Sequence, residues 1–185
     1  MWRASQSIAE YLHETVRTRV LTFNKDLSGK QGYGPRWKEC VAYTARYMPI
    51  ATSALYVRTF FSESSKETAN EMVNTIKDEF ESILRAVSWM DDTTRSAALC
   101  KVKSMENHVG YPNELMDDKK LIEYHKDLVI NENEYLKSVL KLNHFRLETE
   151  SKKFREKVNK TDWDAHANVA IANAYYAWSE NSICE

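Results

Sequence analysis

The ten residues ANVAIANAYY, at positions 167–176, constrain this chain more than any other stretch, because nearly everything before them reads as helix. On an extended chain Val169, Ile171 and Tyr175 fall on one face, and small residues fill most of the other. This alternation predicts a β-strand. The prediction rests on Val169, Ile171 and the tyrosines, because alanine is a poor strand former. No second convincing strand is found in the sequence, and a lone strand cannot satisfy its own backbone. Its partners must come from elsewhere.

The composition is that of a soluble, mainly helical protein. A chain of 185 residues with 43% hydrophobic and 29% charged residues fits one domain or slightly more. Only four glycines and three prolines argue for long helices and against a turn-rich β protein. Twenty-six basic and 27 acidic residues give a net charge of -1, which predicts no nucleic-acid partner. No apolar run approaches the roughly 20 residues of a membrane span, and the first residues are not followed by the apolar core of a signal peptide.

Amphipathic periodicity predicts helices along most of the chain. A first helix over residues 8–23 should close near Gly29, and a later one should begin near residue 131. Between them, the longest helix follows a capping box that starts at Ser64. Its apolar residues recur at three- and four-residue steps and should face a core or a neighbouring helix: Met72, Val73, Ile76, Phe80, Ile83, Leu84 and Val87.

Caps and turns mark the end of this helical region. Asp91 or Asp92 is placed to cap the next helix. Gly110 can adopt the left-handed conformation that ends it, and Pro112 cannot continue it.

The cysteines do not form a recognisable motif. Cys40, Cys100 and Cys184 are widely spaced, odd in number and contain no C-x-x-C pair. They are either three free thiols or one disulfide with a third thiol left over. Asn159 begins the glycosylation sequon N-K-T, which has meaning only if the chain enters the secretory pathway.

No catalytic or metal-binding residue can be assigned from local motifs. The stretch HETVR at residues 13–17 is similar to the zinc signature H-E-x-x-H up to its last position, where the guanidinium of Arg17 cannot ligate a cation. A metal site would need at least three distant residues to converge, because none of the histidines is spaced to share a helix face with another: His13, His108, His125, His144 and His166. No nucleophile elbow is present.

Five phrases, taken together and in order, point to a family. They are ALYV at 54–57, WMD at 89–91 with TR at 94–95, VGYP at 109–112, REKV at 155–158 with Trp163, and NAYY at 173–176. Their order and spacing resemble the neprilysin and endothelin-converting-enzyme family of zinc metallopeptidases, and the resemblance covers essentially the whole chain from Trp2.

The resemblance implies a fold class and a site. The fold would be mainly α: a multi-helix lobe with a single C-terminal edge β-strand, as an incomplete part of a two-lobed metallopeptidase. Residues 1–130 would belong to the helical lobe that restricts access, and residues 131–185 to the beginning of a thermolysin-like catalytic lobe. Asn173 and Ala174 would hold a peptide substrate on the edge strand by β-augmentation. The location would be extracellular or at the cell surface.

The departures from the family concern its chemistry. The family's H-E-x-x-H, its third ligand Glu and a later Asp and His follow this strand, and none of them is in this sequence. We therefore expect no catalytic residue, no metal ligand and no cofactor in this chain, with zinc belonging to the complete family enzyme. The family partner of Cys40 lies upstream of Met1, so Cys40 should be unpaired, whereas Cys100 and Cys184 match no family cysteine.

Three interpretations follow. In the first, the chain is part of a secreted or surface zinc endopeptidase, inactive by itself, whose partner is the peptide substrate of the parent enzyme. In the second, it is a stand-alone module that binds peptides or proteins without catalysis, and its exposed strand or apolar surface permits self-association. In the third, the scattered histidines form an independent hydrolase site.

Overall fold

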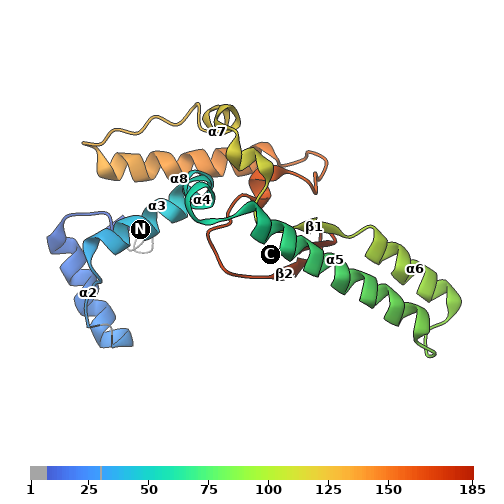
Figure 1. The fold of residues 1–185 in the computed structure, drawn as a ribbon. Helices are drawn as coiled ribbons and strands as arrows, with labels where there is room; N and C mark the ends of the chain where they lie inside the picture. Colours follow the sequence, from blue (N-terminus) through green and yellow to red (C-terminus); the bar gives the residue numbers. More distant parts are fainter. Residues whose placement is uncertain (1–7, 30) are drawn as a thin grey trace. The chain divides into compact units, whose positions relative to one another are not determined.

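The computed structural model describes residues 8–29 and 31–185, which are mainly helical, as predicted (Figure 1). The α-helices are α2 (Glu14–Ser28), α3 (Arg36–Tyr47), α4 (Pro49–Phe60), α5 (Glu63–Ala86), α6 (Asp92–Lys103), α7 (Asp118–Tyr124) and α8 (Tyr135–Lys152). Two short 3-10 helices, η1 (Asn113–Met116) and η2 (Trp163–His166), and three strands, β1 (Glu106–His108), β2 (Tyr175–Ala177) and β3 (Ser182–Cys184), complete the elements. Among the described residues, no helix is long and apolar enough to cross a bilayer.

The chain divides into two compact units, each assembled from two separate segments of the sequence. Unit 1 comprises Met1–Met48 and Ile122–Glu156, and unit 2 comprises Pro49–Leu121 and Lys157–Glu185. Each unit therefore takes residues from both sides of position 130.

Unit 1 is organised around a cluster of tyrosines. The ring of Tyr11 lies edge-on to those of Tyr43 and Tyr47, at centroid distances of 5.2 and 6.0 Å, and 6.2 Å from that of Tyr135 on α8. The hydroxyls of Tyr11 and Tyr47 are hydrogen-bonded at 2.6 Å. Tyrosine can bury its ring while its hydroxyl finds a partner, and Tyr11 and Tyr47 do so by pairing their hydroxyls.

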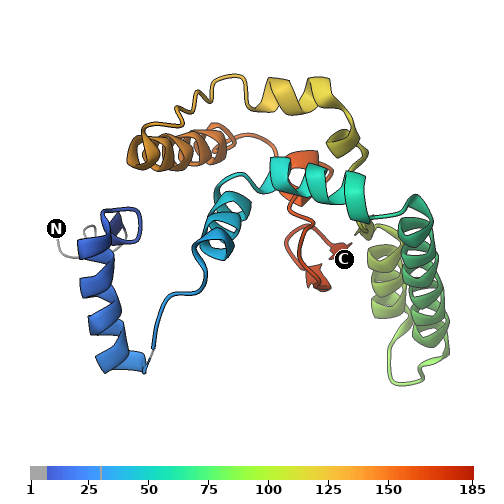
Figure 2. The ribbon, with the colours of Figure 1, turned by 60° about the vertical axis from the view of Figure 1, so that its left-hand side comes forward.

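Helices α5 and α6 lie side by side as a hairpin in unit 2 (Figure 2). The caps of these two helices agree only partly with the sequence analysis. Helix α5 begins two residues earlier than predicted, because Ser62, not Ser64, accepts a hydrogen bond from a backbone amide, that of Ser65, at 3.2 Å. Asp91 caps α6 as predicted and accepts the Thr94 amide at 2.8 Å. Two nearby serines made the first assignment ambiguous, and of the two adjacent aspartates considered for the second, Asp91 is the cap.

The apolar stripe of α5 is only partly covered. Val73 and Leu84 are buried, as predicted. Four other members of the stripe are between 46% and 60% exposed: Met72, Ile76, Phe80 and Ile83. The prediction that the stripe faces a core or a neighbouring helix is therefore wrong for these four residues, which form an exposed apolar face of α5.

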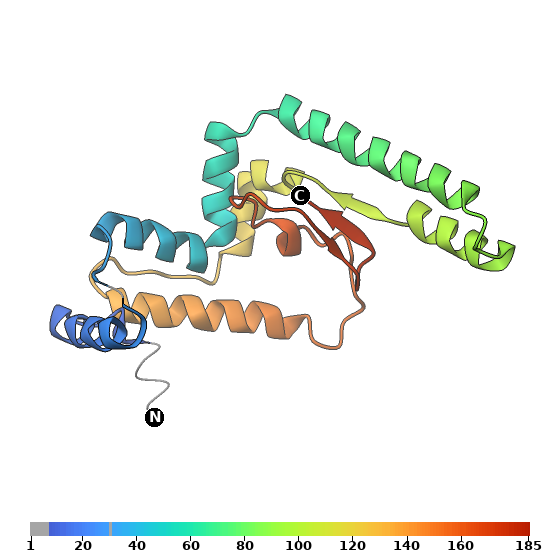
Figure 3. The same ribbon diagram turned by 90° about the horizontal axis from the view of Figure 1, so that it is seen from below.

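The C-terminal strand is shorter than predicted and is not alone. Strand β2 covers only Tyr175–Ala177 and belongs to a three-stranded sheet in the order β1-β3-β2 (Figure 3). β3 pairs in parallel with β1, aligning Cys184 with His108, and antiparallel with β2, aligning Cys184 with Tyr175. The prediction of a single strand is therefore wrong, and Asn173 and Ala174, which were predicted to lie in the strand, precede it. Within the described part of the chain β2 does lie at an edge of the sheet.

Residues 167–174 do not form a strand, because side chains accept hydrogen bonds from some of their backbone amides. The Val169 amide donates to the hydroxyl of Ser53 on α4 at 3.0 Å, and Ser53 is fully buried. The Ala174 amide donates to Oδ1 of Asn173 at 2.9 Å. Each bond replaces one that a neighbouring strand would have supplied.

Candidate functional site

Asn173, one of the two site residues predicted from the sequence, lines a cleft within unit 2. The cleft has a volume of about 390 Å³ and is lined by α5, by residues 107–112, by the end of η2 and by parts of residues 168–175 and the C-terminal strand. Asn173 is among the lining residues, together with His108 and His166.

One wall of the cleft is the VGYP turn, which the fold holds tightly. Gly110 has a φ of +72°, the left-handed conformation expected for it, and a Cβ at this position would lie 3.3 Å from side-chain atoms of both Lys66 and Phe61. Its amide donates to the Glu185 carbonyl at 2.8 Å, and the Glu185 amide donates to the His108 carbonyl at 3.0 Å. Only glycine satisfies both the backbone conformation and the close approach.

Lys66 fastens the same turn to α5. Its Nζ donates to the Tyr111 carbonyl at 2.7 Å and to Oδ1 of Asn113 at 2.9 Å, and it lies 4.3 Å from the centre of the Tyr111 ring. Burial lowers the pKa of Lys66. With its donors directed at the turn, this ammonium serves to hold the wall in place.

Asn173 and Ala174 precede the edge strand directly and are both exposed. Among the described residues β2 pairs only with β3, so its outer edge carries no strand. Oδ1 of Asn173 is already occupied by the Ala174 amide. The asparagine can therefore offer a peptide its NH₂ donors more readily than its oxygen.

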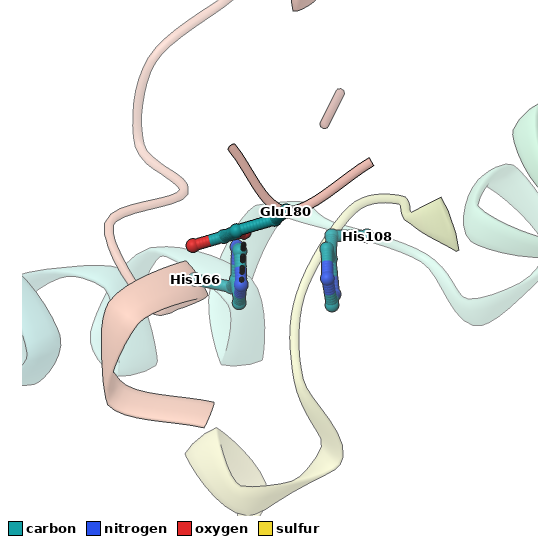
Figure 4. Close-up of side chains that lie close together, drawn as sticks. All are labelled: His108, His166 and Glu180. Atoms are coloured by element: carbon teal, nitrogen blue, oxygen red, sulfur yellow. Dashed lines mark ion pairs between the residues drawn. The ribbon is translucent and has the colours of Figure 1, made fainter. Parts of the chain in front are cut away.

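Three side chains from distant parts of unit 2 meet beside this cleft (Figure 4). His108 ends β1, His166 ends η2, and Glu180 lies in the turn between β2 and β3. The two imidazole rings are stacked, with centroids 3.6 Å apart and planes 11° from parallel. Nε2 of His166 lies 3.5 Å from Oε2 of Glu180. The sequence analysis named both histidines but missed Glu180, because nothing in its local sequence indicates that it would lie next to them.

One nitrogen of each histidine in this cluster, Nε2, lacks a hydrogen-bond partner. Nε2 of His108 and Nε2 of His166 are both buried without a hydrogen bond, since the 3.5 Å approach of Glu180 does not have hydrogen-bond geometry. The side chain of His166 is only 10% exposed, and that of Glu180 is 26% exposed. Burial, followed by the neighbouring His166, lowers the pKa of His108 and so favours its neutral form.

The HETVR stretch does not fit a zinc ion. The side chain of His13 caps α2 by accepting the Thr15 amide. Arg17 is buried and donates to Oε2 of Glu39 at 2.6 Å. The buried guanidinium occupies the place where the zinc signature requires a second imidazole, so these residues form a helix cap and an ion pair.

Among the remaining residues singled out in the sequence, Cys184 lines the cleft, whereas Cys40, Cys100 and Asn159 do not. All three cysteines are free; Cys40 and Cys100 are exposed and Cys184 is buried. Asn159 is exposed, and its Oδ1 accepts both the amide and the hydroxyl of Thr161.

A comparison of the fold with solved structures indicates the class of protein. The described architecture matches the zinc metalloprotease Zmp1 of Mycobacterium tuberculosis, solved in complex with an inhibitor, with a TM-score of 0.80. The two sequences are 24% identical, and the match covers 99% of this chain and 26% of the protease. The chain thus has the fold of a mainly helical part of a metalloprotease of this type.

The sequence comparisons give the family. The sequence model of peptidase family M13 matches residues 1–112 of this chain. The chain is a member of peptidase family M13, in agreement with the resemblance found in its motifs.

The relatives are neprilysins and endothelin-converting enzymes. This chain is 40% identical to Neprilysin-2 of Drosophila melanogaster, 33% identical to the endothelin-converting enzyme homolog of Locusta migratoria and 30% identical to neprilysin of Homo sapiens. Each match covers at least 98% of this chain but only 24–25% of the relative. The chain therefore spans about a quarter of the length of these relatives.

Proposed function

We propose that this chain forms part of a neprilysin-like zinc metalloendopeptidase that cleaves small peptides. In this proposal residues 1–130 contribute the helical lobe that restricts access, and residues 131–185 begin the catalytic lobe. Asn173 and Ala174 hold the peptide substrate at the sheet edge. The parent enzyme acts outside the cell or at its surface.

The observation that carries the proposal is the position of Asn173 and Ala174 directly before an edge strand and beside a cleft. An extended peptide can add to such an edge through backbone hydrogen bonds, and side chains in the cleft can select among peptides. The exposed NH₂ group of Asn173 adds one donor at the end of the edge.

The exposed stripe of α5 supports membership in a larger assembly. Four large apolar side chains, Met72, Ile76, Phe80 and Ile83, follow one another along a single helix face. Such a face is normally covered, and in the parent enzyme we propose that further polypeptide covers it.

We further propose that the 185-residue chain does not hydrolyse peptides by itself. Its sequence contains no H-E-x-x-H, and its nearest approach to one is occupied by the Arg17–Glu39 ion pair. If the parent enzyme is secreted, the exposed Asn159 is a glycosylation site.

Calorimetry with a short apolar peptide tests the edge-strand assignment. We expect Asn173→Ala to weaken binding by roughly 1 kcal/mol, the typical value of one polar contact. Asn168→Ala is the matched control, because Asn168 lines the same cleft but lies outside the edge. Equal losses for both variants would contradict the assignment to the edge, and no binding by the unmodified chain would contradict peptide binding as a whole.

A second function, a stand-alone module that binds peptides or proteins without catalysis, is favoured by the same uncovered edge of β2. The transcript distinguishes the two functions. A reading frame that continues to an H-E-x-x-H stretch supports the peptidase, and a frame that ends after this chain supports the module.

A further inference from the structure

We propose that His108, His166 and Glu180 form a binding site for a divalent transition-metal ion of the zinc type, separate from the peptide-binding edge. This proposal departs from the sequence analysis, which assigned no metal ligand. It concerns residues of unit 2 alone and stands independently of the proposed function.

The three side chains provide a ligand set of the right chemistry. Two imidazoles and one carboxylate are a common set for zinc, and imidazole also suits cobalt, nickel and copper. Each residue offers one ligand atom, and these atoms all lie within 4.8 Å of one another. Three protein ligands leave one tetrahedral position for water.

The ligand atoms of the three side chains must move closer together to bind one ion. Ligand atoms around a tetrahedral zinc with bonds of about 2.0–2.1 Å lie about 3.3 Å apart. Because the stacked rings are nearly parallel, their lone pairs do not converge, and one ring must tilt out of the stack to share an ion. Glu180 is more exposed than His166 and lies in a turn, so its carboxylate can move toward the histidines.

Unsatisfied buried nitrogens are the strongest reason to expect an ion. A buried polar atom without a hydrogen bond typically costs about 1–3 kcal/mol, and native proteins contain few of them. Here two such atoms, both Nε2, lie on facing rings. A proton shared with Glu180 would satisfy only His166, whereas one cation satisfies both rings and the carboxylate.

The electrostatic state of the cluster agrees with metal binding. Histidine ligates metals in its neutral form, and burial lowers the pKa of His108 and so favours that form. The carboxylate of Glu180 supplies a negative charge against the charge of the ion.

A bound ion would join three segments that are otherwise held by short pairings. His108 ends β1, His166 ends η2, and Glu180 lies between β2 and β3, the strand pair next to Asn173. Because metal binding to such a site is coupled to folding, we expect the loaded chain to have a higher melting temperature than the metal-free chain.

The direct test is a titration of the metal-free 185-residue chain. Zn²⁺ is added in competition with a chromophoric chelator, and Co²⁺ is followed by its visible absorption. We expect one equivalent of each ion to bind, and we expect the cobalt spectrum to be that of a low-coordinate nitrogen and oxygen site. His166→Asn and Glu180→Gln should each weaken binding at least ten-fold, since even the loss of a group that only orients a ligand costs about 10- to 100-fold.

His144→Asn provides the matched control. His144 also lies within 3.5 Å of a glutamate, with its Nδ1 3.4 Å from Oε2 of Glu148, but its side chain is 71% exposed and belongs to unit 1. This variant should bind as tightly as the unmodified chain. If His166→Asn loses its helical circular dichroism, Glu180→Gln and the cobalt spectrum of the unmodified chain decide the question.

The outcomes separate this site from the proposed function. Failure of the unmodified chain to bind one equivalent, or equal weakening by His144→Asn, overturns the metal site. Metal binding without peptide cleavage supports both proposals. Metal-dependent cleavage supports the metal site and overturns the inactivity of the chain, and the calorimetric result for Asn173→Ala leaves the metal site unaffected.

Discussion

The two units treat buried polar groups differently. In unit 1 the buried guanidinium of Arg17 binds two carboxylates, Glu39 at 2.6 Å and Glu14 at 3.2 Å, and only its Nε lacks a partner. In unit 2 the imidazoles of His108 and His166 face each other with neither Nε2 hydrogen-bonded.

This difference separates structural from functional burial. A buried charge that is paired with neighbouring charges holds the fold together, and its hydrogen-bonding groups are not free to bind a ligand. Buried polar atoms without partners are the exceptions that call for an explanation, and a ligand site is one of the main explanations. By this criterion the HETVR stretch, which looks more like a metal motif in sequence, is structural, and the dispersed histidines are the candidate site.

The largest expected effect tests the structural side of the comparison. Glu39→Ala removes the main partner of Arg17, and we expect the free energy of unfolding to fall by about 3 kcal/mol, because breaking a buried pair leaves an uncompensated charge. Denaturant unfolding followed by circular dichroism measures the change.

An exposed pair serves as the control for this variant. Glu81 binds Arg85 at 3.2 Å on the surface of α5, so Glu81→Ala should cost only about 0.5 kcal/mol. Similar losses for the two variants would remove the distinction between the buried and the exposed pair.

A smaller loss of stability is expected when glycines in the turns of the two units are replaced by alanine. Gly110→Ala should lower stability by about 2 kcal/mol, because it combines a left-handed backbone with close contacts to Lys66 and Phe61. Thermal or denaturant unfolding of purified variants measures the loss.

Two glycines of unit 1 separate the contribution of the left-handed backbone to this loss of stability from that of the close contacts. Gly29 has a φ of +73° but open space around it, so Gly29→Ala should cost about 1 kcal/mol from the backbone alone. Gly32 has neither constraint, and Gly32→Ala should change stability by less than about 0.5 kcal/mol. A loss at Gly110 no larger than that at Gly29 would show that the cleft wall is not tightly packed.

The smallest effect concerns pH. Burial, together with Glu10, which accepts the hydroxyl of Tyr43 at 3.2 Å, raises the pKa of Tyr43 to about 12. Since the unfolded pKa is about 10, the folded chain holds this proton more tightly, and the associated stability is present below about pH 10 and lost as the pH rises toward 12.

A phenolate absorbance titration tests this prediction. Tyr43→Phe should remove one ionisation near pH 12, and Glu10→Gln should move that ionisation to lower pH. A curve for Tyr43→Phe that superimposes on that of the unmodified chain would place the late ionisation elsewhere.

The sequence predicted the local features of the fold well. The caps at Gly29 and Asp91 lie where their residue types suggested. Gly110 has the predicted left-handed conformation but does not end α6, whose C-cap is Ser104. The cap of α5 was misplaced from Ser62 to Ser64, because several serines in a row offer equivalent local chemistry. Helix periodicity identified the stripe of α5 but not its exposure, since periodicity records which side chains share a face and not what covers that face.

The sheet could not be predicted from the sequence. Strands β1 and β3 have three residues each, too few to show an alternation, and their pairing joins residue 108 to residue 184. The predicted strand over residues 167–176 was too long, because the hydroxyl of Ser53, 116 positions earlier, binds the Val169 amide.

By itself the sequence determined the helical class and the family motifs, because these depend on neighbours within a few positions along the chain. Only the tertiary structure decided which strands pair, which apolar face stays uncovered, and that Glu180 meets His108 and His166. Contacts between distant segments depend on how the whole unit packs, and a site made from such contacts leaves no spacing in the sequence from which it could be recognised.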